Sequence, residues 1–296
     1  MTPESSLLLR LAAAVAEAHR AVPSARAAMV TGSVAKGLAD GISDIDMAIY
    51  YEATLPDDDA LGTIAGQLGA TGRRPLGGPR EEQAFIEAFD LAGVEVQLIH
   101  STISGWEQTM DDLLVRHAVS TPLAKALEGI LCCKALYGEA LIEGWRARAA
   151  DLPHALAVAM VRHYLSFFPA WGVPGQMLRR DPGVWYRQIL VETAQNTLGV
   201  LAGLSRVYYT PFQHKRFRRF VTGLSVAPPD LADRLEALFT LPVPEALPAL
   251  EALVGEVVAL VEQHMPEVDT SAVRRRLGWR KPNWEADAVA CWLGSR

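Results

Sequence analysis

The stretch from Thr31 to Asp46, TGSVAKGLADGISDID, constrains this chain more than any other part of its sequence. It lies between two apolar runs that read as strands. Alternation in the second strand sends Ile45 and Met47 to one face and Asp44 and Asp46 to the other, roughly 6.5–7 Å apart along the strand. Two carboxylates on one half-buried face repel each other, so the arrangement calls for a cation. Mg²⁺ suits it, because this ion is bound by one or two carboxylates together with substrate phosphates.

A glycine–serine turn precedes the carboxylates. Gly32 lets a phosphate approach the backbone, and the N–H groups and hydroxyl of Gly32 and Ser33 can donate to it. The stretch therefore predicts a phosphate-binding turn beside a carboxylate pair, whereas a solvated turn with ordinary surface aspartates is the alternative interpretation.

The pattern resembles the signature of the DNA polymerase beta-like nucleotidyltransferase superfamily, carried here by Gly32-Ser33, Gly37 and Ser43-Asp44-x-Asp46. The length and the helical remainder resemble the aminoglycoside and lincosamide nucleotidyltransferases. The resemblance is specific over roughly residues 27–100 and only architectural beyond them. It implies that Asp44 and Asp46 hold Mg²⁺, two ions in all, and that Gly32, Ser33 and Ser43 contact ATP or another nucleoside triphosphate.

A third carboxylate is expected from the hairpin predicted over residues 84–100. Glu95 and Gln97 share one face of its second strand, and a glutamate in so apolar a strand is costly unless charged partners or a metal await it. The resemblance gives Glu95 the third acidic position, as a metal ligand, as the general base for the acceptor hydroxyl, or as both. Glu87 and Asp90 on the preceding strand are the alternatives.

Beyond residue 103 the strand signal disappears and helical periodicity takes over. Helices are predicted over 4–22 and 55–68, and then over 103–118, 122–137, 139–149, 154–168, 182–206, 229–239 and 244–264. A loop is expected over 73–79, where Arg73 and Arg74 are either phosphate ligands or solvated charges. The fold class expected is α+β: a mixed nucleotidyltransferase sheet with flanking helices over 1–120, followed by an all-α helical-bundle domain over 121–296 that closes the cleft for nucleotide and acceptor.

Basic and aromatic residues interleave over 206–219, a composition that suits phosphate binding and base stacking. The resemblance implies a phosphate-contacting lysine after the long helix, and Lys215 is the best match; a solvated basic helix face is the alternative. Glu192 and Asn196 share one face of that helix and either recognise an acceptor or face solvent.

Composition limits the remaining possibilities. The chain has 296 residues, half of them hydrophobic, and no apolar run of membrane-spanning length. We expect no membrane partner. The three cysteines, two of them adjacent at Cys132 and Cys133, form no disulfide framework, which predicts a reducing cytoplasm. The net charge of −6 disfavours nucleic acid as a general partner but leaves room for local basic patches.

The predicted function is Mg²⁺-dependent transfer of a nucleoside monophosphate, AMP first, to a hydroxyl of a small-molecule acceptor such as an antibiotic, with release of pyrophosphate. Transfer to RNA or protein is an alternative, motivated by the basic segment 274–281 with Trp279 and Trp284 nearby. A nucleotide-binding or toxin–antitoxin module without turnover is a third possibility. The intact carboxylate set argues against it, since a pure binder would not need all three.

Overall fold

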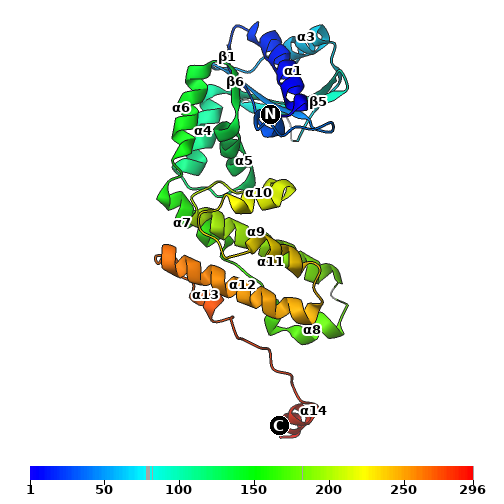
Figure 1. Ribbon diagram of the computed structural model, residues 1–296, viewed down its shortest axis with the longest axis vertical. Coiled ribbons are helices and arrows are strands. Elements are labelled where there is room, and N and C mark those ends of the chain that lie inside the picture. Colours follow the sequence, from blue (N-terminus) through cyan, green and yellow to red (C-terminus); the bar gives the residue numbers. More distant parts are fainter. Residues whose placement is uncertain (78–80, 82, 182, 296) are drawn as a thin grey trace. The chain divides into compact units, whose positions relative to one another are not determined.

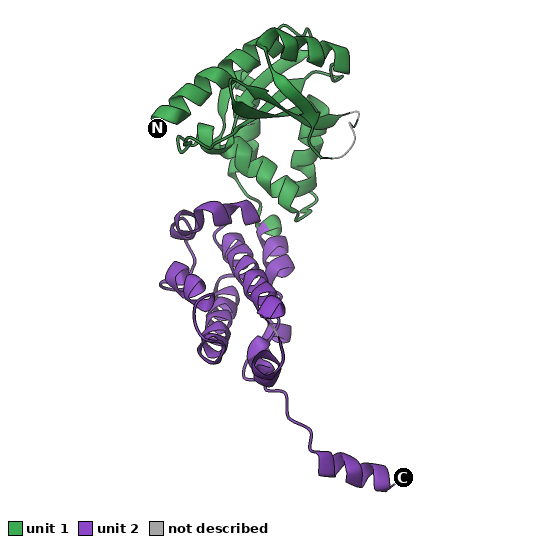
Figure 2. Ribbon diagram, turned by 90° about the vertical axis from the view of Figure 1, so that its right-hand side faces the viewer, with its two compact units in different colours: residues 1–156 green, residues 157–296 purple. Residues whose placement is uncertain are grey.

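The computed structural model describes residues 1–77, 81, 83–181 and 183–295. The chain forms two compact units, Met1–Leu156 and Ala157–Arg296 (Figure 2). Within the described residues, no helix is both long enough and apolar enough to cross a membrane.

Unit 1 is built on a mixed six-stranded sheet with the order β3-β4-β5-β2-β1-β6. Its strands are β1 (Ala25–Val30), β2 (Ile45–Tyr51), β3 (Thr71–Pro75), β4 (Ala84–Leu91), β5 (Val94–Thr102) and β6 (Lys134–Tyr137). The pairing of β2 with β5 is parallel, and the other four pairings are antiparallel. The sheet thus follows the mixed topology expected for the first part of the chain.

Helices cover both faces of this sheet (Figure 1). They are α1 (Pro3–Arg20), α2 (Gly32–Ala35), α3 (Asp58–Leu68), α4 (Ile103–Leu114), α5 (Thr121–Cys132) and α6 (Glu139–Ala150). The apolar stripe of α1, with Ala12 and Val15 fully buried, packs in one core with Ile45, Met47 and Ile49 of β2. On the opposite face, Tyr50 packs against Trp106 of α4 and Trp145 of α6, with ring centroids 5.5 and 4.7 Å away.

Strand β6 is a feature that the sequence interpretation missed. Residues 122–137 read as one helix, but α5 ends at Cys132 and the next residues pair antiparallel with β1. Gly138, at φ +68°, follows the strand, and a Cβ there would lie 2.3 Å from the Arg26 carbonyl oxygen. Pairing with the open edge of β1 therefore overrides local helical periodicity. The expected domain division near Ser120 falls inside unit 1, which ends at Leu156.

The loop predicted over 73–79 is also partly wrong. Residues 71–75 form β3, which pairs with β4, while residues 78 and 79 lie outside the described residues. Alternation along β3 sends the two adjacent arginines to opposite faces of the sheet. Arg73 contacts Glu87, and Arg74 contacts Glu95.

The regular secondary structure described in unit 2 is helical. It comprises most of α7 (His154–Tyr164), then η1 (Ala170–Gly172), α8 (Pro174–Arg179), α9 (Gly183–Leu204), η2 (Pro211–Arg216), α10 (Phe217–Thr222), α11 (Leu231–Leu238), α12 (Val243–His264), α13 (Ser271–Arg274) and α14 (Ala286–Gly294). Glycines let α7 and α9 approach closely: a Cβ on Gly199 would lie 2.2 Å from the Tyr164 ring. A helical second part is thus confirmed, although the range 121–296 expected for it also contains strand β6 of unit 1.

A polar network is buried on the α1 face of the sheet. Tyr51 Oη lies 2.9 Å from His100 Nδ1, and His100 Nε2 lies 3.0 Å from Glu87 Oε1. Arg73 Nε donates to the other Glu87 oxygen at 2.7 Å. Burial acts to raise the pKa of Glu87, but the hydrogen bond to His100 and the charge of Arg73 outweigh it and hold that pKa below its ordinary value. Each polar side chain of this network therefore has a partner.

The neighbouring His19 generates a prediction about stability and pH. Its ring is 2% exposed, its Nδ1–H donates to the Val15 carbonyl at 2.9 Å, and burial lowers its pKa from 6.5 to about 4. The unfolded chain gains a proton on this ring below pH 6.5 while the folded chain does not. Stability is therefore complete above pH 6.5 and is lost between pH 6.5 and 4, by about 2 kcal/mol at pH 5.

Urea unfolding at pH 7 and pH 5 measures this effect in the wild type and in His19→Gln, which cannot titrate there. We expect the wild type to lose more stability than the variant between the two pH values. Equal losses would show that His19 is not the group responsible.

Candidate functional site

The parallel pairing of β2 with β5 builds one polar surface from two distant parts of the chain. Asp46 is the register partner of Gln97, and Ile45 is that of Val96. Alternation then places Asp44 and Asp46 on the same face as Glu95 and Gln97, opposite the core shared with α1. The three acidic residues predicted from the sequence therefore share one face of the sheet.

The Gln97 side chain links two of the carboxylates. Its Nε2 donates to Asp44 Oδ2 at 3.1 Å and to Glu95 Oε1 at 2.8 Å. A single amide nitrogen thus holds two acidic side chains from separate strands within hydrogen-bonding distance of one point. The sequence interpretation placed Gln97 on this face but gave it no role, because the pairing of β5 with β2 cannot be read from local periodicity.

Arg74 supplies a positive charge to the same face. Its guanidinium forms an ion pair with Glu95 and lies 3.6 Å from Asp90, the register partner of Glu95. The Glu95 side chain is 36% exposed, so this ion pair is open to solvent and modest in energy. An exposed pair of this kind can exchange partners, which leaves Glu95 accessible to a substrate or a cation. The loop predicted over 73–79 did not anticipate this contact, which depends on the pairing of β3 with β4.

Gly32 brings the glycine–serine turn against Asp46. The Thr31 N–H donates to the Asp46 carbonyl at 2.8 Å, and the chain turns at once into α2 with Gly32 at φ +62°. A Cβ on Gly32 would lie 2.2 Å from Asp46 Oδ2, so only glycine leaves room for that carboxylate. The N–H groups of Gly32 and Ser33 begin the helix and have no intrahelical acceptor. Donors and a carboxylate therefore meet at this corner.

Ser43 closes the turn that leads into β2. Its hydroxyl donates to Asp40 Oδ1 at 2.9 Å and accepts from the Asp40 N–H at 3.0 Å. In this arrangement the Ser43 side chain orders the chain just before Asp44. Its contact with a nucleotide stays a prediction.

The two alternatives to Glu95 differ in position. Glu87 points to the other face of the sheet, where it belongs to the buried network with His100 and Arg73. Asp90 shares the face of Glu95 but contacts Arg74 at the far side of β5 from the aspartates. Geometry thus favours Glu95 as the third acidic residue of this surface.

Three further candidate residues, Glu192, Asn196 and Lys215, belong to unit 2. Lys215 lies in η2, with Nζ 5.8 Å from the centroid of the Phe212 ring. Asn196 donates to the Ser166 carbonyl at 2.5 Å, and Glu192 accepts from Gln188 at 2.8 Å. Lys215 stays a prediction as a phosphate ligand.

A magnesium ion needs oxygen ligands, which carboxylates can supply. No group of three His, Cys, Asp or Glu side chains that could hold a metal lies among the described residues. Mg²⁺, however, is commonly held by one or two carboxylates and completed by water and substrate phosphates. Asp44 and Asp46 supply two carboxylates beside the Gly32–Ser33 turn, so these two residues fit such an ion, while Glu95 is paired with Arg74.

Comparison with known proteins adds little. No protein-family model and no curated protein matches the chain. A nucleotidyltransferase-like protein from Exiguobacterium sibiricum 255-15 is similar in structure at 10% identity and TM-score 0.41, over 92% of this chain and 82% of that one. The GLD-2/RNP-8 complex (13% identity, TM-score 0.30) covers 85% and 74%, and the non-canonical poly(A) polymerase complex GLD-2–GLD-3 (14%, 0.30) covers 85% and 71%. Because these TM-scores are low, the likeness does not establish the chemistry of this chain.

A substitution at Gly32 can separate two effects: the close approach of Asp46 to this residue and the strain of a left-handed backbone. Gly32→Ala should be destabilising by about 1–2 kcal/mol from its left-handed backbone alone, and by more because the new methyl group meets Asp46. Gly69 has φ +70° with open space around its Cβ position, so Gly69→Ala carries the strain without the clash.

Urea unfolding of both variants, each with and without Asp46→Ala, measures the difference. Removing the Asp46 carboxylate should recover part of the loss in Gly32→Ala and none in Gly69→Ala. Equal behaviour of the two glycine variants in both backgrounds would contradict the close approach.

Proposed function

We propose that this chain is a nucleotidyltransferase that transfers a nucleoside monophosphate, AMP from ATP first, to a hydroxyl group of a small-molecule acceptor. The observation that carries the proposal is the shared face of Asp44, Asp46 and Glu95 beside the Gly32–Ser33 turn. The acceptor oxygen forms a bond to the α-phosphorus, the bond from that phosphorus to the bridging oxygen of the β-phosphate breaks, and pyrophosphate leaves. The acceptor hydroxyl loses its proton in the same reaction.

Each residue of the face has a role in this proposal. The N–H groups of Gly32 and Ser33 bind phosphate oxygens of the triphosphate. Asp44 and Asp46 would hold Mg²⁺, which in a two-ion site stabilises both the attacking and the leaving oxygen. Glu95 releases Arg74 and takes the proton from the hydroxyl group of the acceptor molecule. Gln97 keeps Glu95 and Asp44 oriented toward each other. Lys215 stays a prediction as a further phosphate ligand.

A second acceptor class is favoured by a specific observation. The segment 274–281 carries a run of arginines and a lysine around Trp279, the residue types that bind phosphates and stack on bases. Transfer to the 3′ hydroxyl of a single-stranded RNA therefore stands as the second candidate.

The first test of the proposal concerns nucleotide binding. Asp46→Asn preserves shape and removes charge, so it should abolish Mg²⁺-dependent binding of a non-hydrolysable triphosphate, as measured by calorimetry. Asp90→Asn is the matched control, because it removes a carboxylate from the same face that pairs with Arg74 at the far side of β5 from the aspartates. It should change affinity little. Unchanged affinity in Asp46→Asn would remove the aspartates from the proposal.

The second test concerns the proton acceptor. General-base assistance typically contributes 10²–10⁴-fold to a rate, so Glu95→Gln should lower single-turnover transfer by about that factor. Transfer is followed as pyrophosphate release with each of the four ribonucleoside triphosphates and a panel of hydroxyl acceptors. Triphosphate affinity should fall far less than in Asp46→Asn, because both aspartates remain.

Glu52→Gln is the control for this experiment, since Glu52 lies just beyond β2 and pairs with Arg26 at the surface. A Glu95→Gln variant that transfers at the wild-type rate would assign the proton to solvent. Absence of pyrophosphate release in the wild type with every triphosphate and acceptor would contradict nucleotidyl transfer itself.

A further inference from the structure

The segment that follows α13 is fixed against η1 in unit 2. Trp171 Nε1 donates to the Arg276 carbonyl at 2.8 Å, and the Lys281 N–H donates to the Gly172 carbonyl at 2.7 Å. The Trp279 ring lies directly on Gly172, where a Cβ would be 2.2 Å from a ring carbon. These contacts hold Trp279 between two anchored residues, so its indole has a defined position despite lying in irregular chain.

A groove with a volume of about 740 Å³ opens beside this segment. It is lined by Phe168, Pro169, Val173, Arg275, Arg276, Trp279 and Lys281. The walls are mostly apolar, yet Trp279 keeps 41% of its surface exposed and Phe168 keeps 40%. Aromatic rings that are anchored by the fold and still open are suited to stack on a flat ligand.

A smaller polar compartment of about 200 Å³ shares Phe168 and Arg276 with the groove. Its other lining residues include Ser166, Glu192, Thr193 and Asn196. Hydroxyl, carboxylate and amide groups of this kind can exchange hydrogen bonds with the hydroxyls of a sugar. The ligand that suits both spaces therefore has flat rings and hydroxyl groups.

The charges along the groove indicate an anion. Arg274 is paired with Glu262 at 2.5 Å and Arg280 with Glu251 at 2.6 Å. Among the residues that the structure describes, Arg276 and Lys281 have no ion pair, and both line the groove. Arg275 lines the groove as well, so the rim of this aromatic groove is basic.

Unit 2 also differs from unit 1 in overall charge. It contains 16 Lys and Arg against 13 Asp and Glu, a formal net charge of +3, whereas unit 1 contains 12 against 21. The net charge of −6 for the whole chain therefore conceals a basic unit. Net charge therefore disfavours nucleic acid as a partner of unit 1 but not of unit 2.

We propose that this groove binds single-stranded RNA. Bases stack on Trp279 and Phe168, Arg276 and Lys281 bind phosphates, and the polar compartment takes a ribose hydroxyl. Single-stranded RNA is also the second candidate acceptor of the proposed function. Only the fate of the bound strand rests on that function, because binding itself needs neither Mg²⁺ nor a triphosphate. The two proposals can therefore fail separately.

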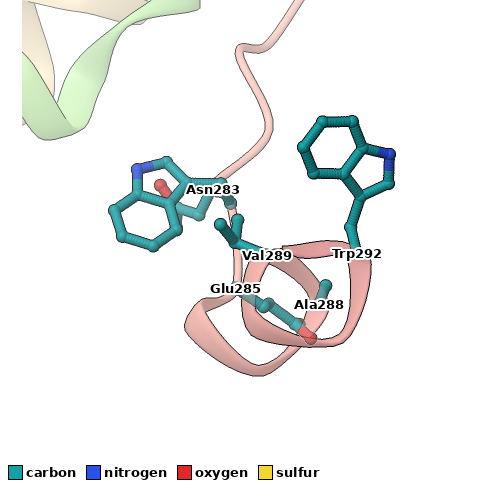
Figure 3. A pocket seen from close by; sticks show the side chains of 6 residues that line it. Asn283, Glu285, Ala288, Val289 and Trp292 are labelled. Carbon is teal, nitrogen blue, oxygen red and sulfur yellow. The ribbon is translucent and has the colours of Figure 1, made fainter. Parts of the chain in front are cut away.

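The pocket at the C-terminal helix offers a contrast. It has a volume of about 420 Å³ and is lined by Asn283, Trp284, Glu285, Ala288, Val289 and Trp292 around α14 (Figure 3). Its one charged lining residue is acidic, so it lacks the cations that a phosphate chain needs. Trp284 is consequently a matched aromatic control, exposed at 77% and outside the groove.

The experiment measures the anisotropy of a fluorescent ten-nucleotide oligo(A) RNA with the full chain, without metal or triphosphate. Trp279→Ala should weaken binding by at least about five-fold, the lower limit for loss of one base stack. Trp279→Phe should restore much of it, which separates stacking from a folding defect. Trp284→Ala should have no effect.

Charge is tested in the same assay with Arg276→Gln combined with Lys281→Gln. Loss of two phosphate contacts should reduce the slope of log affinity against log salt by about 1.4. Arg10→Gln, on the exposed face of α1, is the charge control and should leave the slope unchanged.

Several results would overturn the proposal. One is no binding by the wild type at 100 μM protein, and another is equal affinity of Trp279→Ala and Trp284→Ala. Equal competition by poly-glutamate would assign the groove to an acidic peptide. Equal competition by AMP would reduce it to a mononucleotide site, and DNA of the same sequence binding as tightly as RNA would remove the ribose contact.

Discussion

The parallel ladder between β2 and β5 is the interaction on which the candidate site depends. It brings Asp46 beside Gln97, although the two residues are about a third of unit 1 apart in the sequence, and it fixes which side chains face each other. A shift of one strand by one residue would turn its carboxylates, either Asp44 and Asp46 or Glu95, into the apolar core, where an unpaired carboxylate is very costly. The core under α1 therefore selects the register that assembles the carboxylates on the open face.

Carboxylates on the two faces of the sheet differ in how far they are exposed to solvent. On the α1 face, Glu87 is buried and needs both His100 and Arg73 as partners. On the other face, Glu95 stays partly exposed beside Arg74, so its ion pair is weak enough to exchange. The same sheet thus contains a fixed structural network and a surface whose carboxylates remain accessible for chemistry.

Unit 2 contributes a second kind of surface. Close helix packing at Gly199 builds its core, while the segment after α13 lies against η1 and leaves Trp279 and Phe168 open beside unpaired cations. A carboxylate-rich face in one unit and a basic, aromatic groove in the other would suit a protein that binds nucleotides at both places. The charge asymmetry between the units follows from the sequence, but the groove depends on two hydrogen bonds between residues far apart in the chain.

The sequence by itself determined the elements whose signals are local. Alternation predicted the strand with Asp44 and Asp46 and the hairpin with Glu95, and periodicity predicted helices α7, α9, α11 and α12. Tertiary structure alone decided the rest: the pairing that gives Gln97 its contacts, the strand β6, and the strand that separates Arg73 from Arg74. The physical reason is that edge pairing and ladder register are non-local hydrogen bonds, and these override a weak local preference when a sheet edge is open.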